Sequence, residues 1–453
     1  MGDSVPQAAL DQLRAAVAGE VVAPADGGYD SVRQVHNGMI DKRPAVIVRC
    51  QNTADIVEAV KFARDQSLEI SVRGGGHNVA GRAVTDGGVM IDTQPMKGVH
   101  VDPSTGRVRA QAGLSWDEYN RATAAYGLAT TGGVVSTTGV AGLTLGGGLG
   151  WLMGKYGMAV DNVRSVEVVD AEGRILTADD DENPDLYWAL RGGGGNFGVA
   201  SSFEFDGHPV STIYGGLCAF ALADAPKLWE FFGEFSADAS DDLTLVMAMV
   251  HAPDGSGHKI VGVGMCHCGD LADGEKAADA IRGAATPLLD MLGPLPYPIQ
   301  NTLLDAGFPK GARNYWKSAY FKEITTDTVA TMVDRFEQTP SIMTGMVIEH
   351  FHGAVTRVPA TATAFPHREP GYNLVITGVW PDTSGDDANI AWVRETFGTL
   401  TPFMSDAAYV NYLGDDDGSR VEAAYGPCWE RLQSVKRTYD PDNVFHLNQN
   451  ITP

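Results

Sequence analysis

Residues 71–81 read SVRGGGHNVAG, and this stretch constrains the interpretation of the chain more strongly than any other. They extend an apolar run, LEISVR at 68–73, that predicts a buried strand. Three successive glycines leave backbone N–H groups uncovered, and such groups can form a concave surface that binds a pyrophosphate. His77 would be held next to whatever this loop binds. A structural loop with a surface histidine is the alternative that this segment alone leaves open.

Two more glycine-rich stretches accompany the first. GGVVSTTGVAGLTLGGGLGWLMGKYGMAVDNV, at 132–163, is apolar and almost uncharged, which suits packing against a flat, buried, aromatic ligand, although a glycine-rich interior turn would look similar. DLYWALRGGGGNFGVASSFEF, at 185–205, leads into a strand. A dinucleotide-binding GxGxxG fingerprint instead opens a helix after the first strand of a βαβ unit, so a Rossmann site is rejected.

The pattern around these stretches predicts two lobes. Up to His208-Pro209 strands predominate, with helices expected after Asn52 and from the capping box at Ser115. Beyond that point, apolar strands and helices predict a second α+β lobe built on an antiparallel sheet. From about Asp406 a strand and loop precede a helix at about 420–438. The predicted strands are 45–50, 68–73, 87–92, 107–112, 165–170, 174–178, 199–205, 243–250 and 259–265, and the second-lobe helices are 225–236, 274–283 and 327–337.

Length and charge limit the class of protein. A chain of 453 residues suits two lobes, and a formal net charge of −24 argues against nucleic acid and anionic membranes as partners. No run is long and apolar enough to span a bilayer, and the opening residues lack the apolar core of a secretory signal. We therefore expect a cytoplasmic protein with no nucleic-acid or membrane partner.

The cysteines agree with that expectation. They are scattered and odd in number, which is typical of reduced, buried thiols rather than of a disulfide framework. Cys266-His267-Cys268 is spaced too tightly for a usual zinc pair and lies in a strand-like run, so no metal site is predicted. The five are Cys50, Cys218, Cys266, Cys268 and Cys428.

Four segments together resemble one family: RGGGHNVAG, GLTLGGGLGWL, LYWALRGGGGNFGV and the terminal YDPDNVFHLNQNITP. From about Arg43 onward the chain is similar to the berberine-bridge-enzyme-like branch of the p-cresol methylhydroxylase/vanillyl-alcohol oxidase flavoproteins, and its early part also resembles bacterial 6-hydroxynicotine oxidase-like members. The resemblance implies an α+β fold with a two-part FAD-binding domain of the p-cresol methylhydroxylase type. It assigns 1–208 to FAD binding, 209–405 to a substrate domain with an antiparallel sheet flanked by helices, and 406–453 to a C-terminal return to the FAD domain.

The resemblance also implies covalently attached FAD. His77 stands where family members bond a histidine to the flavin 8α-methyl carbon, which fixes the isoalloxazine and eases hydride acceptance. Many members add a second bond, from a cysteine within Gly-x-Cys-x-x-x-Gly. That context here reads GVVSTTG at 133–139, so Val135 occupies the cysteine position and a single covalent bond is expected.

Further cofactor contacts follow from the same resemblance. They fall on the first two glycine-rich stretches, at the start of the strand that follows the third, and on the C-terminal segment. The expected residues are Arg73, Gly74, Gly75, Gly76, Asn78, Gly81, Val135, Thr138, Gly139, Gly142, Leu143, Gly146, Gly147, Gly148, Gly150, Val199, Asn411 and Asn448.

The resemblance does not decide how the protein uses oxygen. Thr138 falls where the family has a residue that controls oxygen access to the flavin, and its small polar side chain is compatible with oxygen entry. Val135, Thr138 and Leu143 together are also similar to members that form a flavin-N5-oxide. A flavin-dependent oxygenase of secondary metabolism is therefore the alternative to an oxidase.

A catalytic base is expected near the C-terminus. Tyr409-Val410-Asn411-Tyr412 matches the family's YxNY segment, whose second tyrosine is the base in several members, and the resemblance carries that role to Tyr412. A tyrosine with an ordinary pKa of ~10 is a poor base at neutral pH and needs a neighbouring cation or donor, for which Lys317 is a candidate. Tyr412 only lining the cleft or hydrogen-bonding the substrate is the alternative.

Other polar clusters receive structural interpretations. EHFHGAV, at 349–355, alternates like a strand and puts His350 and His352 on one face. A structural role is favoured over a catalytic one for these histidines, and His367 is a further candidate of the same kind. Asp415-Asp416-Asp417 is interpreted as a solvated loop.

The resemblance implies an FAD-linked oxidase that takes a hydride from an alcohol, sugar or amine carbon to flavin N5 and is reoxidised by O2 to H2O2. The expected partners are a small-molecule substrate and O2, with the chain a monomer or homodimer. A non-catalytic flavin-binding protein is disfavoured by the intact YxNY, whereas a dehydrogenase with another acceptor stays open. No motif in the second lobe identifies the substrate.

Overall fold

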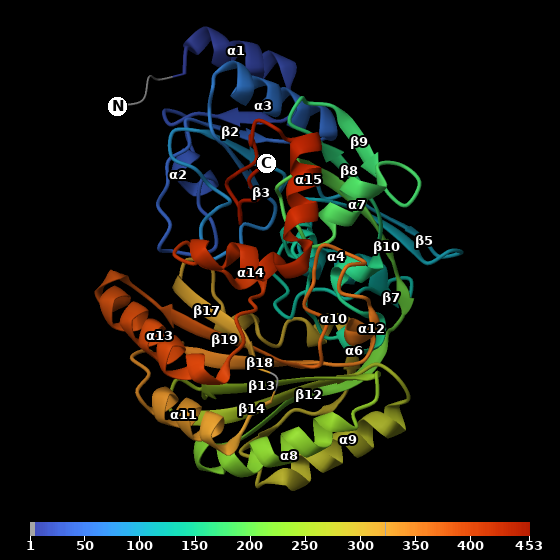
Figure 1. Cartoon of the computed structure of the whole chain (residues 1–453), viewed down its shortest axis with the longest axis vertical. Helices are drawn as coiled ribbons and strands as arrows, with labels where there is room; N and C mark the ends of the chain where they lie inside the picture. Colours follow the sequence, from blue (N-terminus) through green and yellow to red (C-terminus); the bar gives the residue numbers. More distant parts are fainter. Residues whose placement is uncertain (1–4, 322) are drawn as a thin grey trace.

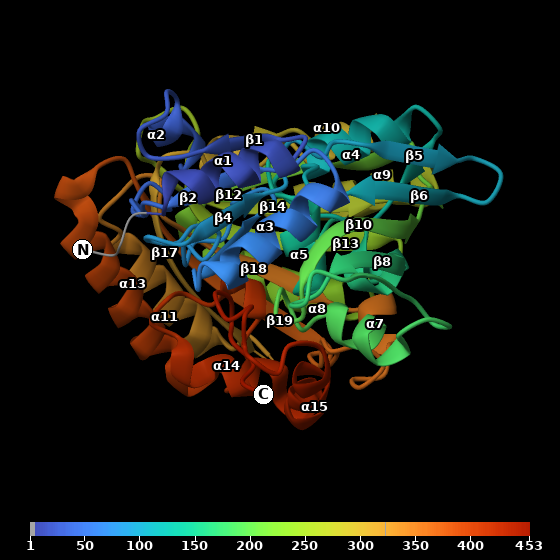
Figure 2. The same cartoon turned by 90° about the horizontal axis from the view of Figure 1, so that it is seen from above.

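The computed structural model describes residues 5–321 and 323–453, which form two lobes stacked along the long axis of the molecule (Figure 1). The upper lobe in that view contains two main sheets, and the lower lobe is built on one eight-stranded sheet. The predicted α+β class is confirmed, with an FAD-binding domain and a substrate domain. Seen from above, α13 (Asp386–Leu400) runs along one side of the molecule, and the hairpin of β5 (Val99–Asp102) and β6 (Arg107–Gln111) projects from the other (Figure 2).

A small mixed sheet begins the upper lobe. Its strand order is β1-β2-β4-β3, in which β2 and β3 run parallel to β4 and β1 is antiparallel to β2. The helix that packs on it starts at the predicted cap, where the Asn52 side chain accepts a hydrogen bond from the Asp55 amide. These elements are α1 (Gln7–Ala16), β1 (Glu20–Val22), α2 (Tyr29–Val32), β2 (Val46–Arg49), α3 (Thr53–Asp65), β3 (Ile70–Arg73) and β4 (Val89–Asp92).

An antiparallel sheet completes the upper lobe, with strand order β5-β6-β10-β8-β9. The predicted capping box is confirmed, since the Ser115 side chain accepts from the Glu118 amide and the Glu118 carboxylate accepts from the Ser115 amide. β5 was not predicted, because its VHVD sequence is short and only partly buried. The elements are β5 (Val99–Asp102), β6 (Arg107–Gln111), α4 (Trp116–Ala124), β8 (Val163–Val169), β9 (Ile175–Ala178), α7 (Pro184–Leu190) and β10 (Val199–Asp206).

One antiparallel sheet organises the lower lobe. Its main order is β15-β12-β14-β13-β18-β19-β17, and β16 also pairs with β12. Helices α8, α9, α11 and α13 cover one face (Figure 1), and Phe220, Met247 and Ile376 are buried beneath them. Neighbouring strand residues point to the opposite face, toward the upper lobe. The elements are β12 (Thr212–Ala221), α8 (Ala225–Ala237), β13 (Leu243–His251), β14 (Lys259–His267), α9 (Leu271–Ala284), β15 (Leu289–Asp290), β16 (Gly293–Pro296), β17 (Arg313–Phe321), α11 (Thr326–Glu337), β18 (Gly345–Phe351) and β19 (Gly371–Trp380).

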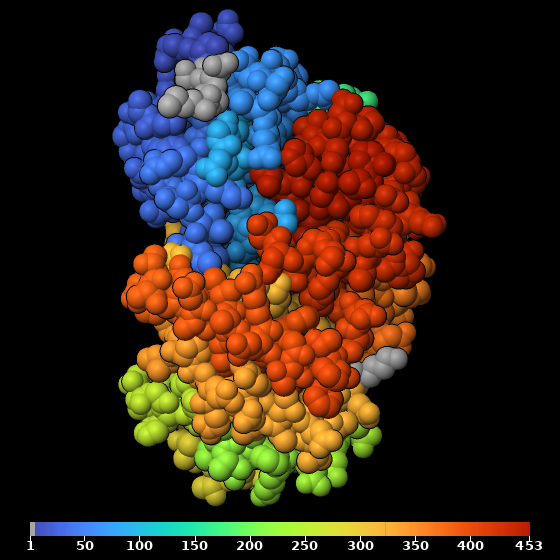
Figure 3. All heavy atoms as spheres, turned by 60° about the vertical axis from the view of Figure 1, so that its left-hand side comes forward, coloured from blue at the N-terminus to red at the C-terminus, as the bar shows by residue number. Residues whose placement is uncertain are grey.

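The C-terminal segment returns to the upper lobe, where it lies against the N-terminal part of the chain (Figure 3). The single helix predicted at 420–438 is wrong: Gly426-Pro427 divides it into α14 (Val421–Tyr425) and α15 (Trp429–Tyr439), because Gly426 adopts a φ of +46°. The strand predicted at the YxNY segment is also wrong, since η6 (Val410–Tyr412) is one 3₁₀ turn. We keep 1–208, 209–405 and 406–453 as proposed domain boundaries.

Short elements connect the larger ones. They are β7 (Leu128–Ala129), α5 (Val140–Leu145), α6 (Met153–Tyr156), η1 (Ala159–Asn162), β11 (His208–Pro209), η2 (Leu222–Asp224), α10 (Tyr297–Gln300), η3 (Asp305–Gly307), α12 (Ala354–Arg357), η4 (Thr383–Gly385), η5 (Thr401–Phe403), η7 (Gly418–Arg420) and η8 (Gly426–Cys428). Over 5–321 and 323–453, no helix combines the length and apolarity needed to cross a bilayer. The same residues contain no cluster of three His, Cys, Asp or Glu side chains with metal-binding geometry. All five cysteines are free, and all but the half-buried Cys268 are buried.

Candidate active site

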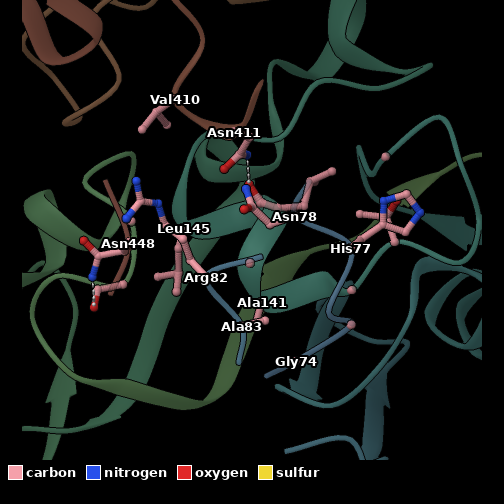
Figure 4. A pocket seen from close by; sticks show the side chains of 18 of the residues that line it. Gly74, His77, Asn78, Arg82, Ala83, Ala141, Leu145, Val410, Asn411 and Asn448 are labelled. Carbon is pink, nitrogen blue, oxygen red and sulfur yellow. Dashed lines mark hydrogen bonds between the residues drawn. The ribbon is translucent and has the colours of Figure 1, made fainter. Parts of the chain in front are cut away.

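A cavity lies where the loops of the upper lobe, the sheet of the lower lobe and the C-terminal segment meet (Figure 4). Most of the expected site residues line it together, although they come from four separate parts of the chain. In Figure 4, His77 lies on one side, Asn78 and Asn411 are near the centre, and Asn448 lies on the other side. The expected residues that line the cavity are Gly74, Gly75, Gly76, His77, Asn78, Val135, Thr138, Gly139, Gly142, Leu143, Val199, Asn411, Tyr412 and Asn448.

Five of the expected glycines do not line the cavity, because neighbouring protein atoms occupy the space that a side chain would need. A Cβ at Gly146 would lie 2.1 Å from Asn411 Oδ1, and one at Gly150 would lie 1.8 Å from the Gly132 carbonyl oxygen. At these positions glycine allows close packing behind the cavity wall. The five are Gly81, Gly146, Gly147, Gly148 and Gly150.

Arg73 likewise lies outside the cavity lining, and it holds the histidine loop from behind. Its guanidinium forms a buried, two-pronged pair with Asp92, with Nη2–Oδ2 at 2.6 Å and Nε–Oδ1 at 3.1 Å. It also donates to the carbonyl oxygens of Val32 and Gln34. Planar recognition of a carboxylate by arginine fixes both partners in place. Arg73 therefore ties the end of β3 to β4 and to the segment before His36.

The glycines of the histidine loop permit a very close approach to the loop at 133–139. A Cβ on Gly75 would lie 2.4 Å from the Gly139 amide nitrogen, so only glycine fits there. Gly76 has a φ of +69°, in the left-handed region that favours glycine, and this turn directs His77 into the cavity. The two loops are thus in direct backbone contact and form one continuous wall.

His77 is held between two neighbours. Its ring stacks on that of His36 with 3.8 Å between centroids and 22° between planes, and Thr137 Oγ1 lies 3.4 Å from His77 Nε2. Burial, and secondarily the neighbouring His36, lowers the pKa of His77 to about 3. The imidazole is therefore neutral at physiological pH and keeps a lone pair available for bond formation.

The loop at 133–139 is fixed from both lobes. The Trp116 amide, at the start of α4, donates to the Thr138 carbonyl oxygen over 2.9 Å. From the lower lobe, Asp305 accepts hydrogen bonds from both the amide and the hydroxyl of Ser136, at 2.8 and 2.6 Å. Asn301 also donates to the Gly133 carbonyl oxygen at 2.7 Å. The loop that carries Val135 and Thr138 is therefore shared by the two lobes.

The cavity fits FAD on the evidence of two further glycines. Gly142 and Gly195 both line it, and neither needs a positive φ. A Cβ on Gly142 would meet no atom within 4 Å, and one on Gly195 would meet only the Asn448 side chain, at 4.0 Å. The bare backbone at these positions leaves room for a ligand rather than for protein. Apolar residues also line the cavity and would suit a flat aromatic ligand: Ile70, Val72, Val199, Ala200, Phe445 and Leu447.

Arg82 adds a positive charge that no motif in the sequence predicts. It lines the cavity and in Figure 4 lies on the Asn448 side, away from His77. Its Nε is buried without a hydrogen-bond partner, and its ion pair with the exposed Asp415 is 3.4 Å long. A buried guanidinium donor favours an anionic partner. The phosphates of FAD match that requirement.

The opposite wall consists of side chains on the sheet of the lower lobe. Val347 and Glu349 on β18 pair in register with Val375 and Asn373 on β19, so these four lie side by side on one face. Trp316 on β17 pairs in the same way with Thr377. All of them except Asn373 line the cavity, together with Leu304 and Phe308 from the loop near η3.

Glu349 is the ionisable group at the centre of that face. Its Oε1 accepts a hydrogen bond from the Tyr412 hydroxyl at 3.2 Å, and its Oε2 accepts one from Asn373 at 2.7 Å. Burial raises the pKa of Glu349 to about 7, against the smaller lowering effect of these two donors. Burial, and then the nearby Glu349, raises the pKa of Tyr412 well above its usual 10. Tyr412 is therefore a protonated phenol, and Glu349 is the group of the pair that titrates near neutral pH.

Lys317 is not the cation that activates Tyr412. Its Nζ is bound to Asp416 and Asp417 at 2.8 and 2.7 Å, and Lys317 does not line the cavity. The interpretation of the aspartate run as a solvated loop is wrong for Asp417, which is buried and accepts from the Gly414 amide at 2.8 Å. Asp416 is partly covered by Lys317 and Arg394, and only Asp415 is largely exposed.

His350 and His352 lie on one face, as the alternation predicts, and their rings stack with 4.5 Å between centroids. That face is turned away from the cavity, which Glu349 lines instead. Burial lowers the pKa of His350 to about 3, so it remains neutral. His367 also lies outside the lining, where Nε2 is 2.8 Å from the Ala424 carbonyl oxygen.

Glu349, Trp316 and Phe308 were missed because they belong to no motif. The signal that could have found Glu349 was present in EHFHGAV. A strand that places two histidines on one face must place the intervening residues on the other, and a carboxylate among apolar residues is unusual there.

The chain is similar to known proteins over most of its length. Two family models match the chain: FAD binding domain over residues 44–179, and berberine and berberine like over residues 408–452. (R)-6-hydroxynicotine oxidase of Paenarthrobacter nicotinovorans is 30% identical over 457 residues, covering 96% of this chain and 97% of that protein. An FAD-linked oxidoreductase of Dictyostelium discoideum is 28% identical over 413 residues, covering 90% and 89%.

Solved structures share the fold. That of 6-hydroxy-D-nicotine oxidase from Arthrobacter nicotinovorans has a TM-score of 0.89 with 27% identity and covers 96% of this chain and 98% of its own. BBE-like 1 of Physcomitrella patens has a TM-score of 0.88 with 21% identity, covering 98% and 99%, which is a likeness of fold alone. Since the similarity extends over nearly the whole length, the chain belongs to the berberine-bridge-enzyme-like family of FAD-linked oxidoreductases.

Proposed function

We propose that this chain is an oxidase that holds FAD covalently through His77 and oxidises a small organic molecule at a carbon bearing a hydroxyl or amino group. Bound FAD supplies a hydride acceptor that O2 can reoxidise with release of hydrogen peroxide. The observation that carries the proposal is the Glu349–Tyr412 hydrogen bond in the same cavity as His77.

The pair is suited to removing the substrate proton. Tyr412 stays protonated, so it acts by accepting a proton from the substrate as its own passes to Glu349 over 3.2 Å. Glu349, with a pKa of about 7, is ionised in a useful fraction of molecules at neutral pH and is a stronger base than an exposed carboxylate. Asn373 holds the second oxygen of Glu349 and keeps the carboxylate facing Tyr412.

The attachment is supported by the surroundings of His77. A neutral imidazole, turned into the cavity by Gly76 and fixed by His36, is a competent nucleophile toward the flavin 8α-methyl group. Val135 at the cavity edge offers no second attachment point. We expect one covalent bond to FAD.

Acid precipitation and intact mass test the attachment. Wild-type protein should keep its yellow colour in the pellet and carry one FAD mass, whereas His77→Ala should release FAD into the supernatant. His100→Ala changes an exposed histidine and should behave as wild type. FAD that remains bonded in His77→Ala would remove the assignment.

The fate of oxygen tests the oxidase class. Photoreduced wild-type protein exposed to air should regain its oxidised spectrum and form one peroxide per flavin. With a turned-over substrate, ¹⁸O₂ should label the peroxide and not the product. Label in the product would instead identify an oxygenase. That alternative stays open because Val135, Thr138 and Leu143, which resemble the residues of oxygenase members, line the cavity together.

A further inference from the structure

The hydrogen bond between Tyr412 and Glu349 joins two separate parts of the chain. Tyr412 belongs to the C-terminal segment and Glu349 to β18 of the lower lobe, and their oxygens are 3.2 Å apart. On its N-terminal side Tyr412 is attached to the upper lobe, because the Asn411 side chain donates to the Leu143 carbonyl oxygen at 3.0 Å. The position of the phenol beside Glu349 therefore depends on how the residues after Tyr412 are attached to the lower lobe.

The chain after Tyr412 lies against β17, which is the edge strand of the lower sheet. The ring of Trp316 is 6.1 Å from that of Tyr412, between centroids. Two residues further along the strand, the Ser318 carbonyl oxygen accepts a hydrogen bond from the Arg420 guanidinium at 2.9 Å. Lys317, which stands between them, is bound to the turn itself. Three consecutive residues of β17 thus contact the segment that carries Tyr412.

The contact made by Lys317 is a buried ion pair. Its Nζ donates to Asp416 Oδ1 at 2.8 Å and to Asp417 Oδ1 at 2.7 Å. Only 8% of the Lys317 side chain and 4% of that of Asp417 are exposed, against 39% for Asp416. The second oxygen of Asp417 accepts from the Gly414 amide at 2.8 Å, which closes a turn two residues after Tyr412. Loss of either partner of such a pair leaves the other as an uncompensated buried charge, so the two stay together.

We propose that Lys317 positions the Tyr412 phenol beside Glu349 by holding the turn that follows Tyr412 against β17. The ion pair fixes Asp417, and Asp417 in turn fixes the Gly414 amide. This inference rests on the proposed function, in which the Glu349–Tyr412 pair removes the substrate proton. It adds a positioning residue that does not itself line the cavity.

The pKa of Glu349 separates positioning from a contribution to stability alone. Burial raises this pKa to about 7, while the hydrogen bonds from Asn373 and Tyr412 lower it. Tyr320 and Tyr409 also lie near the carboxylate, but burial first and nearby charges second raise the pKa of each, so both are neutral phenols. If Tyr412 moves away, Glu349 loses a donor and its pKa rises further. A change in global stability alone leaves this pKa where it is.

Infrared spectroscopy of the holoenzyme measures this pKa without a substrate. The carbonyl band of protonated Glu349 is the one that Glu349→Gln removes, and its intensity is followed against pH. In the wild type the midpoint should lie near pH 7. Lys317→Met should raise the midpoint by about 0.5–1 pH unit, the size expected for the loss of one hydrogen bond. Lys317→Arg, which keeps the cation, should remain close to the wild type.

Arg335→Met is the matched control. Arg335 is a mostly buried cation of the same lobe, paired with Glu395 at 3.2 Å, and it joins α11 to α13 rather than the C-terminal segment to β17. Its loss should lower the stability of the lobe and leave the midpoint of Glu349 unchanged. An equal rise of the midpoint in Lys317→Met and Arg335→Met would overturn the inference, because Lys317 would then act through stability alone.

Tyr412→Phe tests whether Lys317 acts through Tyr412. This substitution removes the hydroxyl that donates to Glu349, so it should raise the midpoint as Lys317→Met does. The two substitutions combined should raise it no further than Tyr412→Phe alone, because both remove the same hydrogen bond. Additive shifts would show that Lys317 affects Glu349 by another route, and would also overturn the inference.

A second variant covers the case in which Lys317→Met does not fold. Lys317→Met/Asp417→Asn leaves no unpaired charge at this ion pair and should raise the midpoint by a similar amount. A midpoint that stays at the wild-type value in these variants, or a wild-type band that does not titrate near pH 7, would overturn the inference. Failure of the proposed oxidase function is read separately, by flavin lost on acid precipitation or by photoreduced protein that makes no peroxide in air.

Discussion

The two walls of the cavity are built by opposite means. The upper wall depends on bare backbone: the loops at 74–78 and 133–139 approach so closely at Gly75 and Gly139 that glycine is required there, and ligand space is left where Gly142 and Gly195 lack side chains. The lower wall is side chains on the register of β17, β18 and β19. A wall of backbone can serve one cofactor in many proteins, whereas a wall of side chains can be changed residue by residue to suit a substrate.

The largest expected effect lies on the side-chain wall. Glu349→Gln should lower the rate of anaerobic flavin reduction by about 10²–10⁴-fold, because the pair loses its proton acceptor. Flavin content should not change, since the upper wall is untouched. Stopped-flow reduction at saturating substrate measures the rate, and a near wild-type rate would show that the lower wall only shapes the cleft.

The pH dependence of flavin reduction tests the same role of Glu349. For wild type, reduction should slow as the pH falls through about 7, because Glu349 must be ionised to accept a proton and burial has raised its pKa to that value. A profile that is flat between pH 6 and 8 would contradict this role for Glu349.

The next effect lies on the backbone wall. Gly142→Leu places a side chain in open cavity space, so flavin occupancy should fall by at least about tenfold while the apoprotein stays folded. Gly398→Leu is the matched control, since it adds the same side chain to an exposed glycine of α13 that has no neighbour within 4 Å. The ratio of flavin to protein absorbance measures both, and equal occupancy would break the contrast between the walls.

A smaller effect concerns stability. Folding raises the pKa of Glu349 from 4.5 to about 7, so the folded state holds this proton more tightly than the unfolded chain. The resulting stability is complete below about pH 4.5 and is lost as the pH rises through about 7. Glu349→Gln should therefore raise the free energy of unfolding by about 1–3 kcal/mol at pH 8 and have little effect at pH 5. Denaturant titrations at the two pH values measure the change in the free energy of unfolding. A gain of equal size at both pH values would show that the raised pKa of Glu349 is not its cause.

The smallest effect tests the positive charge of Arg82 on the upper wall. In a His77→Ala background, where FAD exchanges freely, Arg82→Leu should weaken FAD binding by about 1–2 kcal/mol, since a charge-assisted hydrogen bond to phosphate is lost. Riboflavin, which has no phosphate, should bind equally with or without Arg82. Equilibrium fluorescence titration compares the two ligands, and equal losses for both would mean that Arg82 does not contact the phosphates.

The contrast also explains how much the sequence could predict. The upper wall could be predicted because a site built on bare backbone needs glycine in fixed positions. RGGGHN and the tract at 132–163 show such glycines in the sequence. The glycines behind the wall were assigned to the cofactor because a packing glycine and a ligand-facing glycine look alike in a sequence. Glu349 was missed because its role depends on which strand face meets the other lobe, which is a property of tertiary structure. Lys317 was misassigned for the same reason: its partners are 99 and 100 residues away.

The two hydrogen bonds that Asp305 accepts from Ser136 have a consequence for how the protein can evolve. Leu304 and Phe308, on either side of Asp305, line the cavity from the lower lobe, while Ser136 belongs to the loop that carries Val135 and Thr138. Recombination that imported a foreign 300–308 segment would alter the lower-lobe lining of the cavity and the hydrogen bonds to the loop at 133–139 in a single event. Point substitutions on β17, β18 and β19 can therefore change the lower wall alone. A segment exchange at 300–308 must instead preserve the hydrogen bonds between Asp305 and Ser136.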